Sequence, residues 1–254
     1  MEDLSLLQIL ILSVIQAITE FLPISSSAHL LLPSKLLGWS DQGLFFDVVV
    51  HFASLLAVLT YFWKDLIDPK FYFSRLFQFI VLATIPLVLA TVFIDEIGSM
   101  RWSIETIAVA NIVFALLLYI STKSGNNYKQ LNEMKFTEAL GIGIWQIFSA
   151  ISGASRSGTA ITGALFFGFK REDAARFAVL LSIPTILGAL VYIISQNKIL
   201  IEDRNILATF IAFLTTFTIS YICIGWFISF VKRVGYLPFV LYRLILGIIL
   251  LCLI

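Results

Sequence analysis

Charged residues are scarce in this sequence: aspartate, glutamate, lysine and arginine together make up 13% of its 254 residues. A soluble domain carries about 25% charged and about 45–50% apolar residues, whereas 59% of this chain is hydrophobic. A water-soluble globule of this size cannot bury so large an apolar excess. The composition therefore excludes a soluble enzyme and a disordered chain, and it indicates a protein embedded in a membrane.

Cysteine is also rare, because the chain contains only two, which excludes a disulfide-stapled secreted domain. Cys223 and Cys252 lie in apolar runs without a metal-ligand or C-x-x-C neighbour, so both are expected to be buried structural thiols. The formal net charge of +1 offers no basic surface for a nucleic acid. No nucleic-acid partner is expected, and any anionic ligand must be held by local groups.

Continuous apolar runs separate the few charges, which predicts membrane helices rather than the alternating strands of a barrel. Six runs come near or exceed the length of about 20 residues that spans a bilayer. They cover residues 48–63, 76–94, 104–120, 177–195, 206–231 and 237–254. We expect an all-α polytopic integral membrane protein with six transmembrane helices, in a single membrane domain over residues 1–254.

Two pairs of shorter runs are each interrupted by helix-breaking residues. The first pair covers residues 4–19 and 21–33, with Pro23 and three serines at the break. The second covers residues 139–155 and 157–169, with Gly153 and Gly158 near the break. Because proline, glycine and serine clusters break helices, each pair predicts a re-entrant helix hairpin. Its non-helical tip must be surrounded by protein or by a wet cavity.

The two halves of the chain share short patterns. Gln16 precedes Ser25 by nine positions, and Gln146 precedes Ser155 by nine. Each half contains one hairpin and three spans. An odd number of spans carries the chain across the membrane, so the second half starts on the opposite side of the membrane. This indicates an inverted-topology repeat, with pseudo-repeats over about residues 1–125 and 136–254. The site is expected where the two broken hairpins meet.

The basic residues agree with this topology. With the amino terminus outside, the inside loops carry eleven lysines and arginines and the outside loops three, which is a positive-inside bias. The inside residues are Lys64, Lys70, Arg75, Lys123, Lys129, Lys135, Lys170, Arg171, Arg176, Lys232 and Arg233, and the outside residues are Arg101, Lys198 and Arg204.

Glu20 is the first polar anomaly, because a charged side chain inside the membrane costs about 2.5–3.5 kcal/mol on insertion scales. Gln16 lies one helical turn earlier on the same face. A carboxylate at the membrane surface before the Pro23 turn is one alternative. The functional alternative is a metal ligand or general base in a cavity.

Ser25, Ser26 and Ser27 predict the start of a second half-helix, because serine is a good N-cap. The free N–H groups of that helix would cradle a phosphate, and a plain cap is the alternative. His29 shares a face with Ser25 and Ser26, so it is either part of the same site or a packed histidine. His51 is expected to be structural or to support the site indirectly.

Arg156 is the second anomaly, because apolar runs flank it on both sides. Its planar guanidinium suits phosphate oxygens, and a buried ion pair with Glu20 is a compatible alternative. The residues around it offer hydroxyl groups and a close backbone approach; they are Ser155, Ser157, Gly158 and Thr159.

A carboxylate, a histidine, several hydroxyls and an arginine at two helix breaks suit phosphoryl transfer, which depends on positioning and charge stabilisation. The sequence contains no P-loop, zinc motif or dinucleotide-binding fingerprint. A site within the membrane implies a substrate with a lipid tail. Inverted repeats and broken helices are also transporter features, so a lipid transporter or flippase is the alternative function.

Residues 16–29 resemble the (E/Q)-x-x-x-E motif and following segment of the bacterial undecaprenyl-diphosphate phosphatases, the bacitracin-resistance family. Residues 152–159 resemble that family's P-G-x-S-R-S-x-x-T motif, and the likeness covers nearly the whole chain. It implies hydrolysis of the C55 lipid diphosphate to the monophosphate carrier of cell-wall synthesis. It also implies a divalent cation, Mg or Ca, and a site open to the outer face of the bacterial plasma membrane.

By motif position, the resemblance assigns catalytic roles to Glu20, Ser26, His29 and Arg156, and Glu20 also becomes the metal ligand. The expected substrate-binding residues are Gln16, Ser25, Ser27, Ser155, Ser157, Gly158 and Thr159.

Three positions depart from the family pattern. Gln16 stands where many members have glutamate, which leaves one fewer carboxylate for a metal, and Ser152 replaces the motif proline. In the third departure, Thr159-Ala160 replaces the usual order, in which threonine comes one position later. The motif hydroxyl must therefore come from Thr159 or Thr162, and the sequence does not rank them. Ser26 or a water molecule is the expected nucleophile, with His29 moving the proton. A homodimer and flipping of the product are left open, and membrane lipids are the remaining expected partners.

Overall fold

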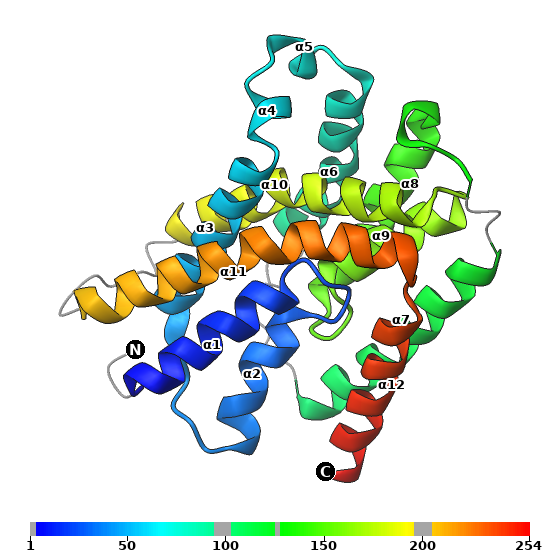
Figure 1. Ribbon diagram of the computed structural model, residues 1–254. Coiled ribbons are helices and arrows are strands. Elements are labelled where there is room, and N and C mark those ends of the chain that lie inside the picture. Colours follow the sequence, from blue (N-terminus) through cyan, green and yellow to red (C-terminus); the bar gives the residue numbers. More distant parts are fainter. Residues whose placement is uncertain (1–3, 94–102, 125–127, 196–204) are drawn as a thin grey trace.

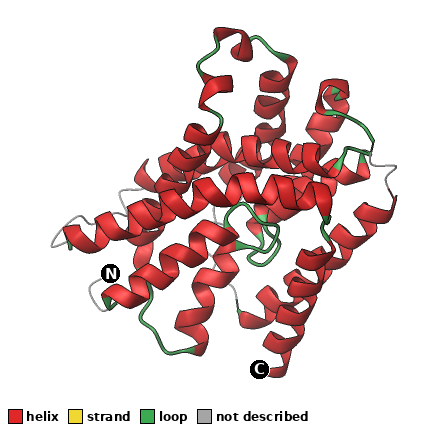
Figure 2. Ribbon diagram, in the orientation of Figure 1, coloured by secondary structure: helices red, strands yellow, loops and turns green. Residues whose placement is uncertain are grey.

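The computed structural model describes residues 4–93, 103–124, 128–195 and 205–254. Helices account for nearly all of these ranges, which contain no strand (Figure 2). The α-helices are α1 (Leu6–Thr19), α2 (Ser26–Leu36), α3 (Gly43–Tyr61), α4 (Trp63–Leu66), α5 (Pro69–Tyr72), α6 (Arg75–Phe93), α7 (Ile104–Ser124), α8 (Phe136–Ile147), α9 (Arg156–Phe166), α10 (Arg171–Ser195), α11 (Ile206–Arg233) and α12 (Leu237–Cys252).

Four of these helices, α3, α7, α10 and α11, are long and apolar enough to cross a membrane. The other two predicted spans, α6 and α12, are also helices, and their apolar parts are shorter. The protein is therefore an all-α polytopic membrane protein, as the composition predicts. The three basic residues expected in the outside loops, Arg101, Lys198 and Arg204, lie outside the described residues.

The two interrupted segments form helix–loop–helix hairpins, α1–α2 and α8–α9. Their loops meet at the centre of the molecule, as Figure 2 shows. α9 contacts α7, α8 and α10, and nine consecutive residues of it are buried. The hairpins are where the sequence predicts them, and their re-entry into a bilayer stays a prediction.

Glycine lets two helix pairs pack closely. A Cβ atom on Gly143 of α8 would lie 2.5 Å from the carbonyl oxygen of Ala83 on α6, and one on Gly247 of α12 would lie 2.9 Å from that of Ala108 on α7. Small residues at helix contacts allow such approach in membrane proteins. The contacts α6–α8 and α7–α12 therefore depend on having no side chain at these two positions.

The two cysteines do not share one environment. Cys223 is buried on α11, as expected, whereas Cys252 at the end of α12 is exposed. Successive residues turn by about 100° around a helix, so Cys252 lies on the face opposite to Leu250, which is buried. The expectation of two buried thiols is therefore wrong for Cys252.

The loops of the two hairpins have the same unusual backbone at corresponding positions. Ser25 and Ser155 are the N-caps of α2 and α9 and have φ angles of 73° and 72°. No other non-glycine residue in the described ranges has a positive φ. Such conformations cost about 1–3 kcal/mol each and persist where the surroundings enforce them. The match agrees with the pattern that motivates the inverted repeat, whose boundaries stay a prediction.

Direct hydrogen bonds join the two loops. The hydroxyl of Ser157 donates to the carbonyl of Leu22 at 2.7 Å, and the amide of Gly153 donates to the Ser25 hydroxyl at 3.2 Å. Each loop therefore satisfies polar groups of the other, which is necessary where the backbone is buried and irregular.

Arg243 of α12 ties the same loops together from a third element. Its side chain is fully buried and donates to the carbonyls of Pro23, Gly153 and Ala154 at 3.2, 2.7 and 3.0 Å. A guanidinium presents donors in a rigid fork, so one side chain fixes carbonyls from both hairpins.

We predict that Arg243→Ala destabilises the protein by at least about 3 kcal/mol, because it strands three buried carbonyls that each cost about 1–3 kcal/mol unpaired. Arg243→Lys should fall between the alanine variant and the unmodified protein, because an ammonium lacks the fork. The check is the midpoint of thermal unfolding in detergent, followed by tryptophan fluorescence. Arg233→Ala, at the exposed end of α11, is the control. An unchanged midpoint for Arg243→Ala would contradict this role.

Candidate active site

Glu20 and Arg156 form an ion pair between the two hairpins. Glu20 directly follows α1, and Arg156 is the first residue of α9. Arg156 Nη2 lies 2.8 Å from Glu20 Oε1, with 15% and 6% of the respective side chains exposed. Two charges at this depth are tolerated only as partners. Residues 136 positions apart therefore meet in one polar site.

The second oxygen of Glu20 accepts two further hydrogen bonds. Gln16 Nε2 donates to Oε2 at 3.0 Å and the Ser26 hydroxyl donates to it at 2.9 Å. His51 Nε2 lies 3.7 Å from the same oxygen, while its Nδ1 lies 2.7 Å from the carbonyl of Asp47. His51 thus borders the carboxylate, in the supporting position that the sequence analysis allows.

The guanidinium of Arg156 retains donors for a ligand. Nη1 donates to the carbonyl of Ala178 on α10 at 3.2 Å, and Nη2 donates to Glu20. Arginine has five N–H donors, so these two bonds leave three. The bond to Ala178 also fixes the direction in which the fork points.

His29 lies three residues after Ser26 on α2, and its hydrogen bonds go to residues outside the ion pair. Its Nδ1 is 2.7 Å from the carbonyl oxygen of Ser25, and its Nε2 is 2.6 Å from the hydroxyl of Tyr242. The two rings are stacked, with centroids 5.6 Å apart. A carbonyl only accepts, so Nδ1 carries a proton, and Nε2 of the neutral ring accepts from Tyr242. Within the described part of the chain, His29 has no hydrogen bond to Glu20 or Ser26.

The remaining hydroxyls mostly shape the loops. Ser25 and Ser27 pair at 3.3 Å, and Ser155 and Ser157 pair at 3.2 Å. The Ser155 hydroxyl also accepts from the amide of Gly158 at 3.1 Å and so caps α9. These hydroxyls therefore fix the conformation of the two loops, and their roles in substrate binding stay a prediction.

The two threonines of the second motif have similar surroundings. Thr159 and Thr162 donate to the carbonyls of Arg156 and Gly158, in their own helix, at 2.9 and 2.7 Å. Both side chains are buried. Each hydroxyl thus has a backbone partner, and the expected substrate contact of Thr159 stays a prediction.

The amino termini of α2 and α9 differ in their capping. Ser155 caps α9, whereas the Ser25 side chain accepts no hydrogen bond from a backbone amide of α2. Its hydroxyl pairs instead with the amide of Gly153 and the hydroxyl of Ser27. The first turn of α2 therefore lacks a side-chain cap from its N-cap residue. Uncapped N–H groups at a helix start attract anions.

Gln16 gives the site one more unused polar atom. Its Oε1 is buried without a hydrogen-bond partner among the described residues, and its Nε2 holds Glu20. Magnesium typically binds one or two carboxylates together with substrate phosphates and water. No cluster of three or more histidine, cysteine, aspartate or glutamate side chains occurs in the described ranges. The oxygen atoms of Glu20 and Gln16 therefore fit a cation that would also bind the phosphate of a ligand.

Sequence reasoning gave no site role to Tyr242 and Arg243, although their segment, residues 239–243, resembles one of the bacitracin-resistance family. Arg243 carried a further signal, because it is a charge inside an apolar run, like Glu20 and Arg156. Tyr242 carried no physical signal of its own, since a tyrosine in an apolar run is ordinary. Only the packing of α12 against the loops brings it to His29, 213 positions away.

Known proteins resemble this chain over almost all of its length. An undecaprenyl-diphosphatase of Teredinibacter turnerae is 41% identical over 97% of this chain and 98% of its own. One of Alcanivorax borkumensis is 44% identical over 96% of this chain and 97% of its own. One of Aliivibrio salmonicida is 44% identical over 93% of each.

The family model described as bacitracin resistance protein BacA matches residues 9–249. This range includes both hairpins, the ion pair between Glu20 and Arg156, and the Tyr242–His29 contact. The chain belongs to the BacA family of bacitracin resistance proteins.

Proposed function

We propose that this protein hydrolyses undecaprenyl diphosphate to undecaprenyl phosphate and inorganic phosphate, and so recycles the lipid carrier of cell-wall synthesis. One observation carries the proposal: the Glu20 carboxylate lies 2.8 Å from the guanidinium of Arg156, on the other hairpin, and 2.9 Å from the hydroxyl of Ser26. The three full-length relatives bear the name of this activity. We place the enzyme in the bacterial plasma membrane, with its site facing the outer side.

The diphosphate binds at Arg156 and the first turn of α2. Arg156 has three unused N–H donors directed by its bond to Ala178, and the start of α2 lacks a cap from Ser25. A guanidinium fork and free backbone amides are the two groups that best match phosphate oxygens. The lipid tail then extends into the surrounding bilayer.

Ser26 is the nucleophile in this proposal. Its hydroxyl already donates to Glu20 at 2.9 Å, which is the geometry of a nucleophile with its general base. The Ser26 oxygen bonds to the terminal phosphorus while the bond to the bridging oxygen breaks, and Glu20 takes the proton. Undecaprenyl phosphate leaves, and water then hydrolyses the phosphoserine. Arg156 stabilises the charge on the transferred group.

Glu20 and Gln16 would hold the divalent cation, Mg or Ca, together with the phosphates. When bound, this cation offsets the negative charge of the diphosphate. Gln16 would contribute a neutral oxygen where many members have glutamate, so the substrate phosphates would supply more of the negative charge around the cation. Tyr242 fixes the orientation of His29, which is the proposed proton carrier for the second step, the attack of water on the phosphoserine.

We predict that Glu20→Gln lowers the rate of phosphate release by about 10²–10⁴-fold, because it removes the general base. The assay uses purified protein in detergent, a C15 or C55 diphosphate as substrate, and no gradient. The control is Glu138→Gln, which breaks a carboxylate–lysine pair with Lys129 outside the site. Full activity of Glu20→Gln would reject the assignment, and substrate binding without phosphate release by the unmodified protein would favour a transporter.

We predict that rapid acid quenching during turnover traps a phosphate on Ser26, because the phosphoserine forms before water attacks. Peptide mass spectrometry locates it, and Ser26→Ala should abolish both the label and the activity. Ser34 lies on the same helix, with its hydroxyl on the carbonyl of Leu31, and should stay unlabelled. An active protein without any label on Ser26 would assign the attack to water.

We predict that Tyr242→Phe lowers kcat by about 3–10-fold with little change in KM, because one hydrogen bond of about 0.5–1.5 kcal/mol is lost. The phenylalanine ring keeps the stacking on His29. Tyr221→Phe, a tyrosine packed on Tyr61 away from the site, is the control. Equal kinetics for both variants and the unmodified protein would show that Tyr242 does not position His29.

A further inference from the structure

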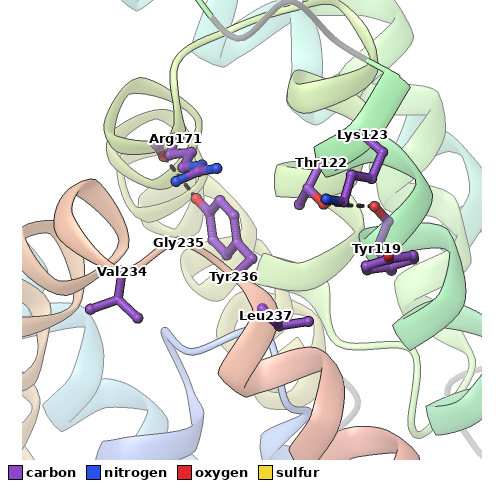
Figure 3. A pocket seen from close by; sticks show the side chains of 8 residues that line it. All are labelled: Tyr119, Thr122, Lys123, Arg171, Val234, Gly235, Tyr236 and Leu237. Carbon is purple, nitrogen blue, oxygen red and sulfur yellow. Dashed lines mark hydrogen bonds between the residues drawn. The ribbon is translucent and has the colours of Figure 1, made fainter.

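A second polar cavity lies away from the hairpin loops, between the ends of α7, α10, α11 and α12 (Figure 3). It has a volume of about 250 Å³ and is lined by Tyr119, Thr122, Lys123, Arg171, Val234, Gly235, Tyr236 and Leu237. None of these eight residues is acidic. We name it the basic pocket.

Two cations face the basic pocket without a carboxylate partner. Lys123 and Arg171 form no ion pair in the part of the chain that the structure describes. Lys123 Nζ lies 5.8 Å from the ring centre of Tyr119. Glu172, the residue after Arg171, points instead to Lys232, at 3.9 Å. The lining of the pocket therefore carries two cations and no carboxylate.

Tyr236 holds the backbone of Arg171 in place at the pocket. The buried hydroxyl of Tyr236 donates to the carbonyl of Arg171 at 2.8 Å, and Figure 3 shows the two basic side chains on either side of this ring. A Cβ atom on Gly235 would lie 3.0 Å from Arg171 Nη1. Burial, and after it the negative charge of Glu172, raises the pKa of the Tyr236 phenol well above its ordinary value, so the phenol adds no negative charge.

Helix polarity acts differently on the two cations. Arg171 is the first residue of α10, where the helix dipole disfavours a cation, and Glu172 and Asp173 in the same turn offset that effect. Lys123 lies near the end of α7, where the dipole favours a cation. Neither acidic residue lines the pocket, so a negatively charged ligand there would face both cations.

The rim of the pocket is apolar and exposed. Val234 is 52% exposed, Leu237 51% and Tyr119 40%. Exposed apolar groups beside two cations match a molecule with a phosphate at one end and a hydrocarbon tail at the other. The cavity is smaller than the about 300–1,000 Å³ of a typical ligand site, so it fits the headgroup and leaves the tail outside.

We propose that the basic pocket binds the phosphate headgroup of an anionic membrane lipid. The positive-inside distribution puts Lys123 and Arg171 at the inner face, where anionic lipids attract basic groups. This site is separate from the hairpin loops, and lipid binding there does not depend on the proposed hydrolysis.

The test measures lipid binding in an Arg156→Gln background, which removes the cation of the hairpin site. The probes are dioctanoyl phosphatidic acid, dioctanoyl phosphatidylcholine and inorganic phosphate, titrated into detergent-solubilised protein and followed by native mass spectrometry. Lys123→Gln/Arg171→Gln is the pocket variant. Lys64→Gln/Lys70→Gln removes the same charge from another predicted inside loop and is the matched control.

We expect the background protein to prefer phosphatidic acid, and the pocket variant to lose about 10-fold or more in affinity, because charged hydrogen bonds are removed. The control should change less than about 3-fold on the same scale. Equal losses in both variants or no loss in the pocket variant would overturn the proposal, and so would loss of binding in an Arg156→Gln protein that still shows a cooperative unfolding transition. Inorganic phosphate binding as tightly as phosphatidic acid would assign the pocket to free phosphate and overturn it too.

Folding of the pocket variant is checked with Arg156 restored. Phosphate release and the unfolding midpoint should then match those of the unmodified protein, because neither side chain belongs to the hairpin site. If the double variant does not fold, Lys123→Gln alone gives the binding test. Unchanged phosphatidic acid affinity in that single variant would equally reject the proposal.

Discussion

The buried ion pair between Glu20 and Arg156 is the interaction on which the arrangement of this protein depends. Neither charge is stable alone at this depth, because the partner left by removing one of them costs about 3–5 kcal/mol. The pair therefore requires both hairpins to end at the same point. Once they meet, the loops satisfy each other through Ser157 and Ser25, and Arg243 secures the carbonyls that remain. The contacts that hold the two hairpins together are therefore also the contacts of the proposed active site.

Ser25 and Ser155 have the same backbone conformation in the two loops, but their hydroxyls make different contacts. Ser155 turns its hydroxyl inward and caps α9, whereas Ser25 faces the opposite loop and leaves α2 without that cap. The second hairpin thus supplies the fixed cation, and the first supplies the carboxylate, the hydroxyl of Ser26 and the helix start. Because the two loops supply different groups, one polar site arises where the two broken helices meet.

Most of the architecture could be predicted from the sequence, because hydrophobic runs and helix breakers act locally. The breaks after α1 and α8 follow from their proline, glycine and serine clusters, and the clustering of Glu20 with Arg156 follows from the cost of charge in an apolar segment. Tyr242 could not be found this way, since its meaning comes from packing of α12 on the first hairpin. Cys252 was placed wrongly because an apolar run does not say which face of its helix is covered. The positive φ of two serines had no local signal either.

A double-mutant cycle on unfolding tests the central claim most directly. Glu20→Gln, Arg156→Gln and the double variant are compared with the unmodified protein by their stability in one detergent. If the two side chains form one buried pair, the double variant loses less than the sum of the single losses, by about 0.5–3 kcal/mol. Losses that add to within about 0.5 kcal/mol would show that the hairpins do not meet through these charges, and the shared site would be contradicted.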